Sequence, residues 1–147
     1  MTTTRPSVTD ERLHHEVERF YARQMQLLDS GAAREWAATF TEDGVFTANA
    51  HPEPQRGRAA IEAGALDAIS RLEAQAVQRR HWLGMLTVDH GADGTFVART
   101  YALVIETPEH GRAAVRLSCT CRDVLVRRDG ALLVRHRQVH RDDLPAA

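Results

Sequence analysis

The sequence predicts an α+β domain in which three N-terminal helices pack on one face of a strongly bent antiparallel sheet. Apolar residues recur at helical spacing in the first half of the 147-residue chain, whereas the second half alternates apolar and polar residues in long runs. Turn sequences rich in Gly, Asp and Pro separate these runs, so we expect the strands to pair as antiparallel neighbours.

Three helices are expected before the long strands. The first begins at Thr9 or Asp10, which can cap it, and ends at Ser30-Gly31. The second covers residues 32–40, and the third covers about residues 58–76 after Gly57. Between the last two, residues 41–44 form a turn and residues 45–47 a short strand, which ends before the prolines of the loop at residues 51–54.

The second half of the chain reads as four strands joined by turns. The strands are expected over residues 80–88, 95–105, 113–126 and 131–139, with turns at residues 91–94, 108–111 and 128–130. We therefore expect a flexible N-terminus over residues 1–9, a single domain over residues 10–143 and a tail over residues 144–147.

Composition excludes several classes of partner. Acidic residues (20) nearly balance basic ones (19), and the net charge of −1 does not favour nucleic acid or an anionic membrane. No apolar run is long enough to span a bilayer, and the N-terminal residues lack the apolar stretch of a signal peptide, so a cytoplasmic location is expected.

The sequence predicts neither a metal site nor a disulfide. Cys119 and Cys121 lie one residue apart on an expected strand and are expected to be reduced, buried thiols. His136 and His140 face the same way, but as metal ligands they need a third partner such as His81. No nucleotide-binding glycine motif occurs in the chain.

The order of elements and four local stretches resemble a known family. The stretches are FYARQMQLLDSG (residues 20–31), WAATFTEDGVF (36–46), GRAAI (57–61) and RRHWLG (79–84). They resemble SnoaL-like polyketide cyclases and relatives of scytalone dehydratase and of ring-hydroxylating dioxygenase small subunits, all with the nuclear-transport-factor-2-like cone fold. The resemblance covers about residues 10–143. It implies a blind, mostly apolar cavity in which a few ionisable side chains decide the chemistry.

His81 is the first candidate for proton transfer. It begins the first long strand, shares a face with Leu83 and Met85, and matches a scytalone dehydratase histidine that faces the pocket. An imidazole exchanges protons near neutral pH, although a structural histidine bonded to a backbone carbonyl is the alternative. Tyr21, on the apolar face of the first helix, is expected either to donate to a developing oxyanion or to pack with its hydroxyl toward solvent.

The family's Tyr-Asp pair on the first helix does not occur in this chain. Counting back from Asp29, Met25 and Gln26 occupy those positions, so the base of scytalone-type dehydration must come from elsewhere. Glu106 falls where the dehydratase has its second pocket histidine and is a candidate base with a raised pKa. In the alternative reading, Glu106 is a solvated carboxylate beside a turn and has no catalytic role.

Asp123 is the other candidate base, because it lies mid-strand on the same face as the two cysteines and is expected to be buried. In the alternative reading, Asp123 has a structural role and is neutralised by Arg135 or a neighbouring arginine. The remaining side chains expected to line the cavity and bind substrate are Met25, Trp36, Met85, Val104, Cys119, Cys121 and His136.

The resemblance implies a small cofactor-free enzyme of secondary metabolism, of cyclase, dehydratase or isomerase type, acting on a hydrophobic polyketide-like or other enolisable metabolite. The alternative is a non-catalytic ligand-binding or assembly subunit, as small dioxygenase subunits are. We also expect a homodimer through the outer face of the sheet, where residues 99, 101 and 103 alternate beside residues 120, 122 and 124.

Overall fold

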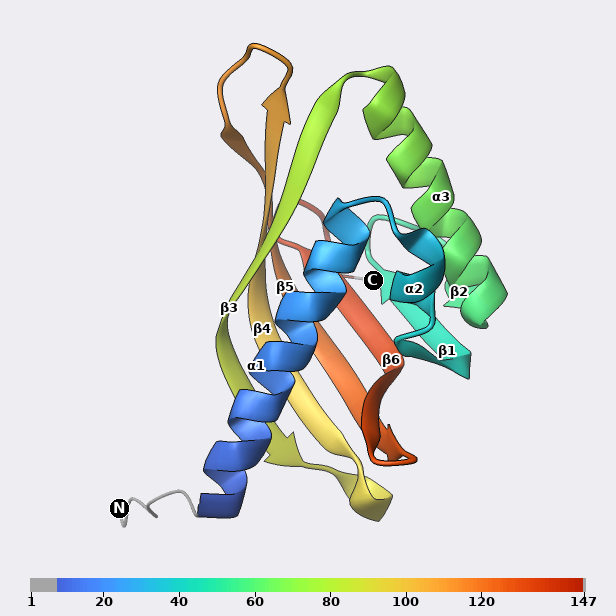
Figure 1. The fold of residues 1–147 in the computed structure, drawn as a ribbon, viewed down its shortest axis with the longest axis vertical. Coiled ribbons are helices and arrows are strands. Elements are labelled where there is room, and N and C mark those ends of the chain that lie inside the picture. The colour runs from blue at the N-terminus through green and yellow to red at the C-terminus, as the bar shows by residue number, and fades with distance from the viewer. Residues whose placement is uncertain (1–7, 147) are drawn as a thin grey trace.

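A computed structural model describes residues 8–146 and confirms the α+β fold class, with three helices on one face of a six-stranded sheet (Figure 1). The helices are α1 (Val8–Asp29), α2 (Ala33–Ala37) and α3 (Arg58–Ala74). The strands are β1 (Phe40–Ala48), β2 (Gln55–Arg56), β3 (Val77–His90), β4 (Phe96–Pro108), β5 (Ala114–Arg128) and β6 (Ala131–Arg141), and a 3-10 turn, η1 (Ala92–Gly94), joins β3 to β4. Residues 1–7 of the expected flexible N-terminus lie outside the described part of the chain, and residues 8 and 9 belong to α1.

The four long strands pair as antiparallel neighbours, as expected, but the complete sheet is mixed. Its strand order is β2-β1-β6-β5-β4-β3, and β1 runs parallel to β6. The second helix is shorter than expected and the first strand begins earlier, at Phe40, which pairs with Val134. A bulge between Phe40 and Val45 accommodates the residues expected to form a turn, so the strand continues through them.

Helix α1 and the short α2 cover the closed end of the concave face. Val17, Phe40 and Val134 are fully buried there, and the rings of Trp36 and Phe40 meet edge to face with centroids 5.1 Å apart. The C-terminal end of α3 lies apart from α1 (Figure 1), and Ile61 and Ala65 are the buried residues of α3. The core therefore fills one end of the cone and leaves space at the other.

A polar network is buried inside this core. Asp123 of β5 and Arg137 of β6 are cross-strand partners, and Nε and Nη2 of Arg137 donate to the two carboxylate oxygens at 2.9 and 2.8 Å. Tyr21 Oη donates to Asp123 at 2.6 Å, and the same Nη2 donates to Gln24 Oε1 at 2.6 Å. Asp123 is 0% exposed and Arg137 is 4% exposed. The network ties α1 to β5 and β6.

Burial and the charge of Asp123 together leave Tyr21 and Arg137 protonated. Burial and the neighbouring Asp123 carboxylate raise the pKa of Tyr21 well above its usual value, so the phenol keeps its proton. Burial alone would lower the pKa of Arg137, but the charge of Asp123 outweighs it and the pKa is raised. The pair is therefore ionised and close to neutral as a unit.

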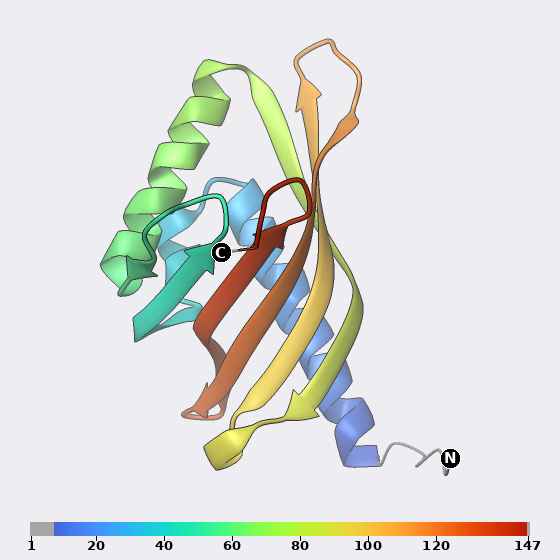
Figure 2. The ribbon, with the colours of Figure 1, turned by 180° about the vertical axis from the view of Figure 1, so that it is seen from behind.

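The opposite face of the sheet has no helix over it within residues 8–146 (Figure 2). Trp82 and Tyr101 project from this face and are 66% and 62% exposed. In the described part of the chain, no helix is both long enough and apolar enough to cross a membrane.

We predict that Asp123→Ala lowers the free energy of unfolding by about 3–5 kcal/mol, because it leaves the Arg137 cation buried without a counter-charge. Tyr21→Phe removes one hydrogen bond to a charged group and is expected to cost roughly 1.5–3 kcal/mol. Urea denaturation measures both. Glu16→Ala, which breaks the exposed ion pair of Glu16 with Arg127 at 2.8 Å, is the control and should cost less than about 1 kcal/mol. A loss for Asp123→Ala no larger than that of the control would contradict the structural role of the network.

Candidate functional site

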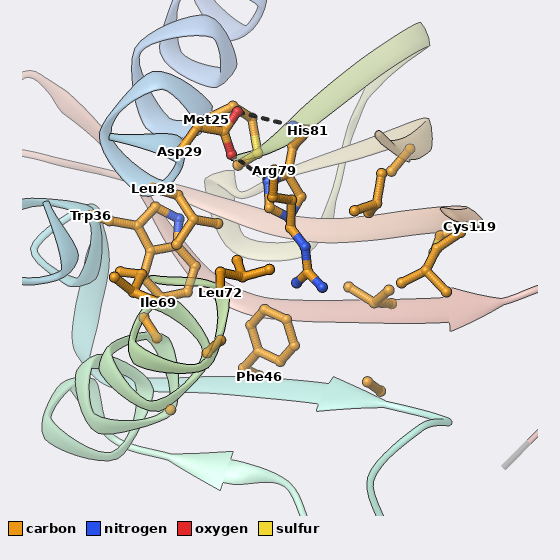
Figure 3. Close-up of a pocket in the computed structure, with 18 of the residues that line it drawn as sticks. Met25, Leu28, Asp29, Trp36, Phe46, Ile69, Leu72, Arg79, His81 and Cys119 are labelled. Atoms are coloured by element: carbon orange, nitrogen blue, oxygen red, sulfur yellow. Dashed lines mark hydrogen bonds and ion pairs between the residues drawn. The ribbon is translucent and has the colours of Figure 1, made fainter. Parts of the chain in front are cut away.

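A cavity of about 620 Å³ opens between α3, the C-terminal end of α1 and the concave face of the sheet. Its walls are mostly apolar, and Figure 3 shows Trp36, Ile69 and Leu72 grouped on one side of it, away from His81. A volume of this size holds a ligand of two or three fused rings. The ionisable side chains at the wall of this cavity are therefore the candidates for chemistry on an apolar ligand.

Asp29 and His81 form a hydrogen-bonded pair at the cavity wall (Figure 3). His81 Nδ1 lies 2.6 Å from Asp29 Oδ1, and the backbone N–H of His81 donates to Asp29 Oδ2 at 2.9 Å. The Asp29 side chain is 7% exposed and the imidazole is 20% exposed. Both carboxylate oxygens are thus held by the same residue of β3.

The chain places Asp29 at the last position of α1, followed by a turn at Gly31, whose φ of +86° favours glycine. A carboxylate at a helix C-terminus is opposed by the helix dipole. The two hydrogen bonds from His81 offset this cost. Asp29 therefore weakens the end of α1 slightly, and its carboxylate is held as a hydrogen-bond acceptor beside β3.

This geometry decides which ring nitrogen of His81 carries the proton. An ionised carboxylate only accepts hydrogen bonds, so Nδ1 donates to Asp29 and the neutral imidazole keeps its lone pair on Nε2. Within residues 8–146, Nε2 has no hydrogen-bond partner. The pair therefore has the arrangement of a general base oriented by a carboxylate.

The structure places His81, Met25, Trp36, Val104 and the two cysteines at the cavity wall. Burial raises the pKa of both thiols, so Cys119 and Cys121 are poor nucleophiles and act as apolar lining.

The expectation that Met85 lines the cavity is wrong. Met85 is 77% exposed, has a positive φ of 54° and lies in a bulge that shifts the pairing of β3 with β4 between Gly84 and Thr87. The bulge breaks the alternation that relates Met85 to His81, so the side chain turns to solvent.

The other predicted site residues lie elsewhere. Tyr21 and Asp123 are outside the cavity lining and bind each other and Arg137, so the partner of Asp123 is the neighbouring arginine at 137 and not Arg135. Glu106 is not a free base, because Arg79 Nη2 donates a hydrogen bond to its carboxylate at 2.7 Å. It also lies outside the cavity lining.

His136 is likewise outside the lining. Its Nε2 lies 3.4 Å from Thr47 Oγ1, and burial, with Arg122 second, lowers its pKa. The imidazole is therefore held neutral between β6 and β1, and it contributes nothing to the cavity wall.

Asp29 was not identified as a candidate site residue from the sequence. Two signals point to it: an acidic residue at the end of a helix, where a basic one is preferred, and a histidine on the neighbouring wall of the expected cone. Arg137 was missed for another reason. Nothing in the alternation of β6 distinguishes it from the exposed arginines around it.

Among the described residues, no cluster of three or more His, Cys, Asp or Glu side chains is arranged to hold a metal ion. His136 and His140 lie within hydrogen-bond distance of Thr47 and Asn49 respectively, both near the C-terminal end of β1.

Comparison with known proteins gives a consistent result. The model of the SnoaL-like domain matches residues 11–138. Aln2 from a Streptomyces species is 39% identical, with 95% of this chain and 96% of that chain covered and a TM-score of 0.84. A structure from Catenulispora acidiphila in complex with S-DNPA is 41% identical, with 90% and 96% covered and a TM-score of 0.79.

An NTF2-like protein with a cystatin-like fold from Novosphingobium aromaticivorans is 26% identical, with 95% of this chain and 86% of that chain covered and a TM-score of 0.77. It confirms the expected nuclear-transport-factor-2-like fold. No curated protein matches the sequence.

We predict that the native protein resists alkylation by iodoacetamide at a pH about equal to the ordinary thiol pKa, because burial keeps Cys119 and Cys121 as thiols. Both should react fully in urea. Mass spectrometry of the labelled peptides measures each site. Rapid labelling of Cys121 in the folded protein would contradict the raised pKa of this thiol, which burial and Asp123 cause.

Proposed function

The chain belongs to the family of SnoaL-like domains, and we propose that it is a small cofactor-free enzyme that moves a proton on a hydrophobic, enolisable ligand held in the cavity. The observation that carries the proposal is the Asp29–His81 pair at an apolar wall. A relative solved in complex with S-DNPA supports the proposal that this chain also binds a ligand. A polyketide-like metabolite of secondary metabolism is the class that the family resemblance favours.

The proposed step uses His81 as the base. Nε2 takes a proton from the carbon next to a ligand carbonyl, the C–H electron pair moves into the new C=C bond, and the carbonyl oxygen becomes an enolate. Asp29 stabilises the imidazolium that forms, as an ionised partner within hydrogen-bond distance. No electron acceptor or metal takes part in this balance.

The fate of the enolate decides the reaction type. Return of the proton to another carbon gives isomerisation, and its transfer to a departing hydroxyl gives dehydration. Attack of the enolate carbon on a second carbonyl, with the proton passing to the new alkoxide, gives cyclisation. All three use one positioned proton carrier, so His81 has the same role in each.

Neither Tyr21 nor Asp123 is given a step in this proposal. The Tyr21 hydroxyl donates its hydrogen bond to Asp123, and Asp123 also accepts two hydrogen bonds from Arg137. Glu106 is likewise committed to Arg79. We therefore assign the proton transfer to the Asp29–His81 pair.

We predict that the protein accelerates exchange of the α-protons of 2-tetralone, a hydrophobic enolisable ketone, for deuterium in D₂O. His81→Gln should lower the rate of exchange by roughly 10²–10⁴, the usual contribution of a positioned base. Proton NMR measures the rate. Exchange that is equally fast in His81→Gln would exclude His81 as the base. A protein that binds 2-tetralone without accelerating exchange would instead favour the non-catalytic binding subunit.

We predict that Asp29→Asn loses nearly as much activity as His81→Gln, by a different route. The oxygen of the new side-chain amide is expected to keep accepting the His81 backbone N–H, which turns the amide NH₂ group toward Nδ1. Nδ1 must then accept, so the proton moves to Nε2 and the base is lost, a drop of roughly 10²–10⁴. The same exchange assay measures the effect. Glu106→Gln, at the competing carboxylate, is the control and should keep the wild-type rate; the reverse result would transfer the role to Glu106.

We propose further that two copies of the chain pair through the uncovered face of the sheet. Tyr101, Leu103 and Trp82 lie on adjacent strands, with Trp82 directly opposite Leu103, and so form a continuous apolar area. An apolar area of this kind on a sheet face favours a second copy of the same surface over water.

We predict a dimer at micromolar concentration by sedimentation velocity, and a monomer for Tyr101→Glu, which places a charge in the centre of that area. Glu109→Gln, in an exposed turn on the β4–β5 hairpin, is the control and should stay dimeric. A wild-type protein that sediments as a monomer would contradict this pairing.

A further inference from the structure

Arg137 has one nitrogen that the buried network does not use. Nε donates to Asp123, and Nη2 donates to both Asp123 and Gln24. Nη1 has no hydrogen-bond partner within residues 8–146. Arg137 is 4% exposed, and in the described part of the chain its Nη1 is the one guanidinium nitrogen that remains free to donate to a molecule outside the network.

The open nitrogen faces the cavity. Arg137 belongs to the cavity lining, whereas Tyr21 and Asp123 do not. Among the described residues, the fully enclosed polar atoms that lack a partner are Trp36 Nε1, Thr41 Oγ1 and Thr100 Oγ1. Nη1 is not one of them, so it reaches open space, and the cavity is the open space beside Arg137.

The guanidinium is held rigidly in this position. Asp123 fixes it from β5 and Gln24 fixes it from α1, while the rings of Tyr21 and Phe40 lie 5.8 and 5.4 Å from its central carbon. An arginine fixed on these sides offers its free N–H groups in one direction only. Such a donor selects ligands by the position of one acceptor atom.

The charge of the site decides the kind of acceptor. The Asp123 carboxylate already neutralises the Arg137 cation through two hydrogen bonds. A ligand carboxylate would bring a second negative charge into the buried site without a further counter-charge. A neutral oxygen, such as a ketone or quinone carbonyl, gains a charge-assisted hydrogen bond and adds no charge.

We propose that Arg137 Nη1 binds a neutral carbonyl oxygen at the buried end of the ligand, which makes Arg137 a specificity-determining residue of this cavity. The inference builds on the proposed function, because it names the ligand class as fused-ring ketones or quinones. Arg137 lies on β6 and His81 on β3, so the carbonyl that Arg137 binds orients the ligand on one wall while the proton moves at the other.

The test compares two probes of the same shape, 9-fluorenone and fluorene, which differ by a carbonyl in place of a methylene. We expect the wild-type protein to bind fluorenone about 10- to 100-fold more tightly, as one hydrogen bond to a charged donor provides. The infrared carbonyl band of bound fluorenone should shift to lower frequency than in an apolar solvent. Neither readout needs turnover, so either can fail while proton transfer at His81 stands.

Arg137→Lys keeps the positive charge beside Asp123 and removes the guanidinium fork. The preference for fluorenone should fall to within about threefold, and the band should return toward its position in apolar solvent, while fluorene binds as before. Arg79→Lys is the matched control at the opposite wall, where Arg79 is paired with Glu106, and should keep the preference.

Three results would overturn the proposal. They are equal affinity of the wild-type protein for the two probes, no binding of either probe, and loss of the preference in Arg79→Lys but not in Arg137→Lys. If Arg137→Lys does not fold, the affinities and the carbonyl band of the wild-type protein still decide the matter.

Discussion

The buried ion pair between Asp123 and Arg137 holds the rest of the molecule in place. It joins neighbouring strands and, through Tyr21 and Gln24, fixes the middle of α1 against the sheet. With α1 fixed there, its C-terminal end reaches β3 and brings Asp29 to His81. Arg137 is also part of the cavity wall, so the same pair joins the core of the fold to the candidate site.

The cavity and its proton carrier depend on each other. The mostly apolar wall lowers the local dielectric constant, which strengthens the hydrogen bond between Asp29 and His81. A buried carboxylate without a partner is costly. The two other candidate bases are both paired with an arginine, Asp123 with Arg137 and Glu106 with Arg79. Pairing removes these two carboxylates from proton chemistry, whereas His81 keeps an open nitrogen at the cavity wall.

The sequence was sufficient for the fold class, the long strands and the cavity position of His81, because strand alternation and turn chemistry are local properties. It failed where the local pattern is broken. The bulge after Gly84 reverses the side on which Met85 lies, and the bulge after Phe40 extends a strand through an apparent turn. The parallel pairing of β1 with β6 and the pairing of Asp29 with His81 join residues 52 or more positions apart, which no local pattern reports.

The central claim is that Asp29 fixes the protonation of His81, with the proton on Nδ1 and the lone pair on Nε2 at the cavity wall. Nitrogen-15 NMR of the labelled protein tests it most directly, at a pH about two units above the ordinary histidine pKa, with the His81 signals assigned by their absence in His81→Gln. The account predicts a protonated Nδ1 and an unprotonated Nε2 in the wild-type protein. A wild-type His81 with its proton on Nε2 would contradict it.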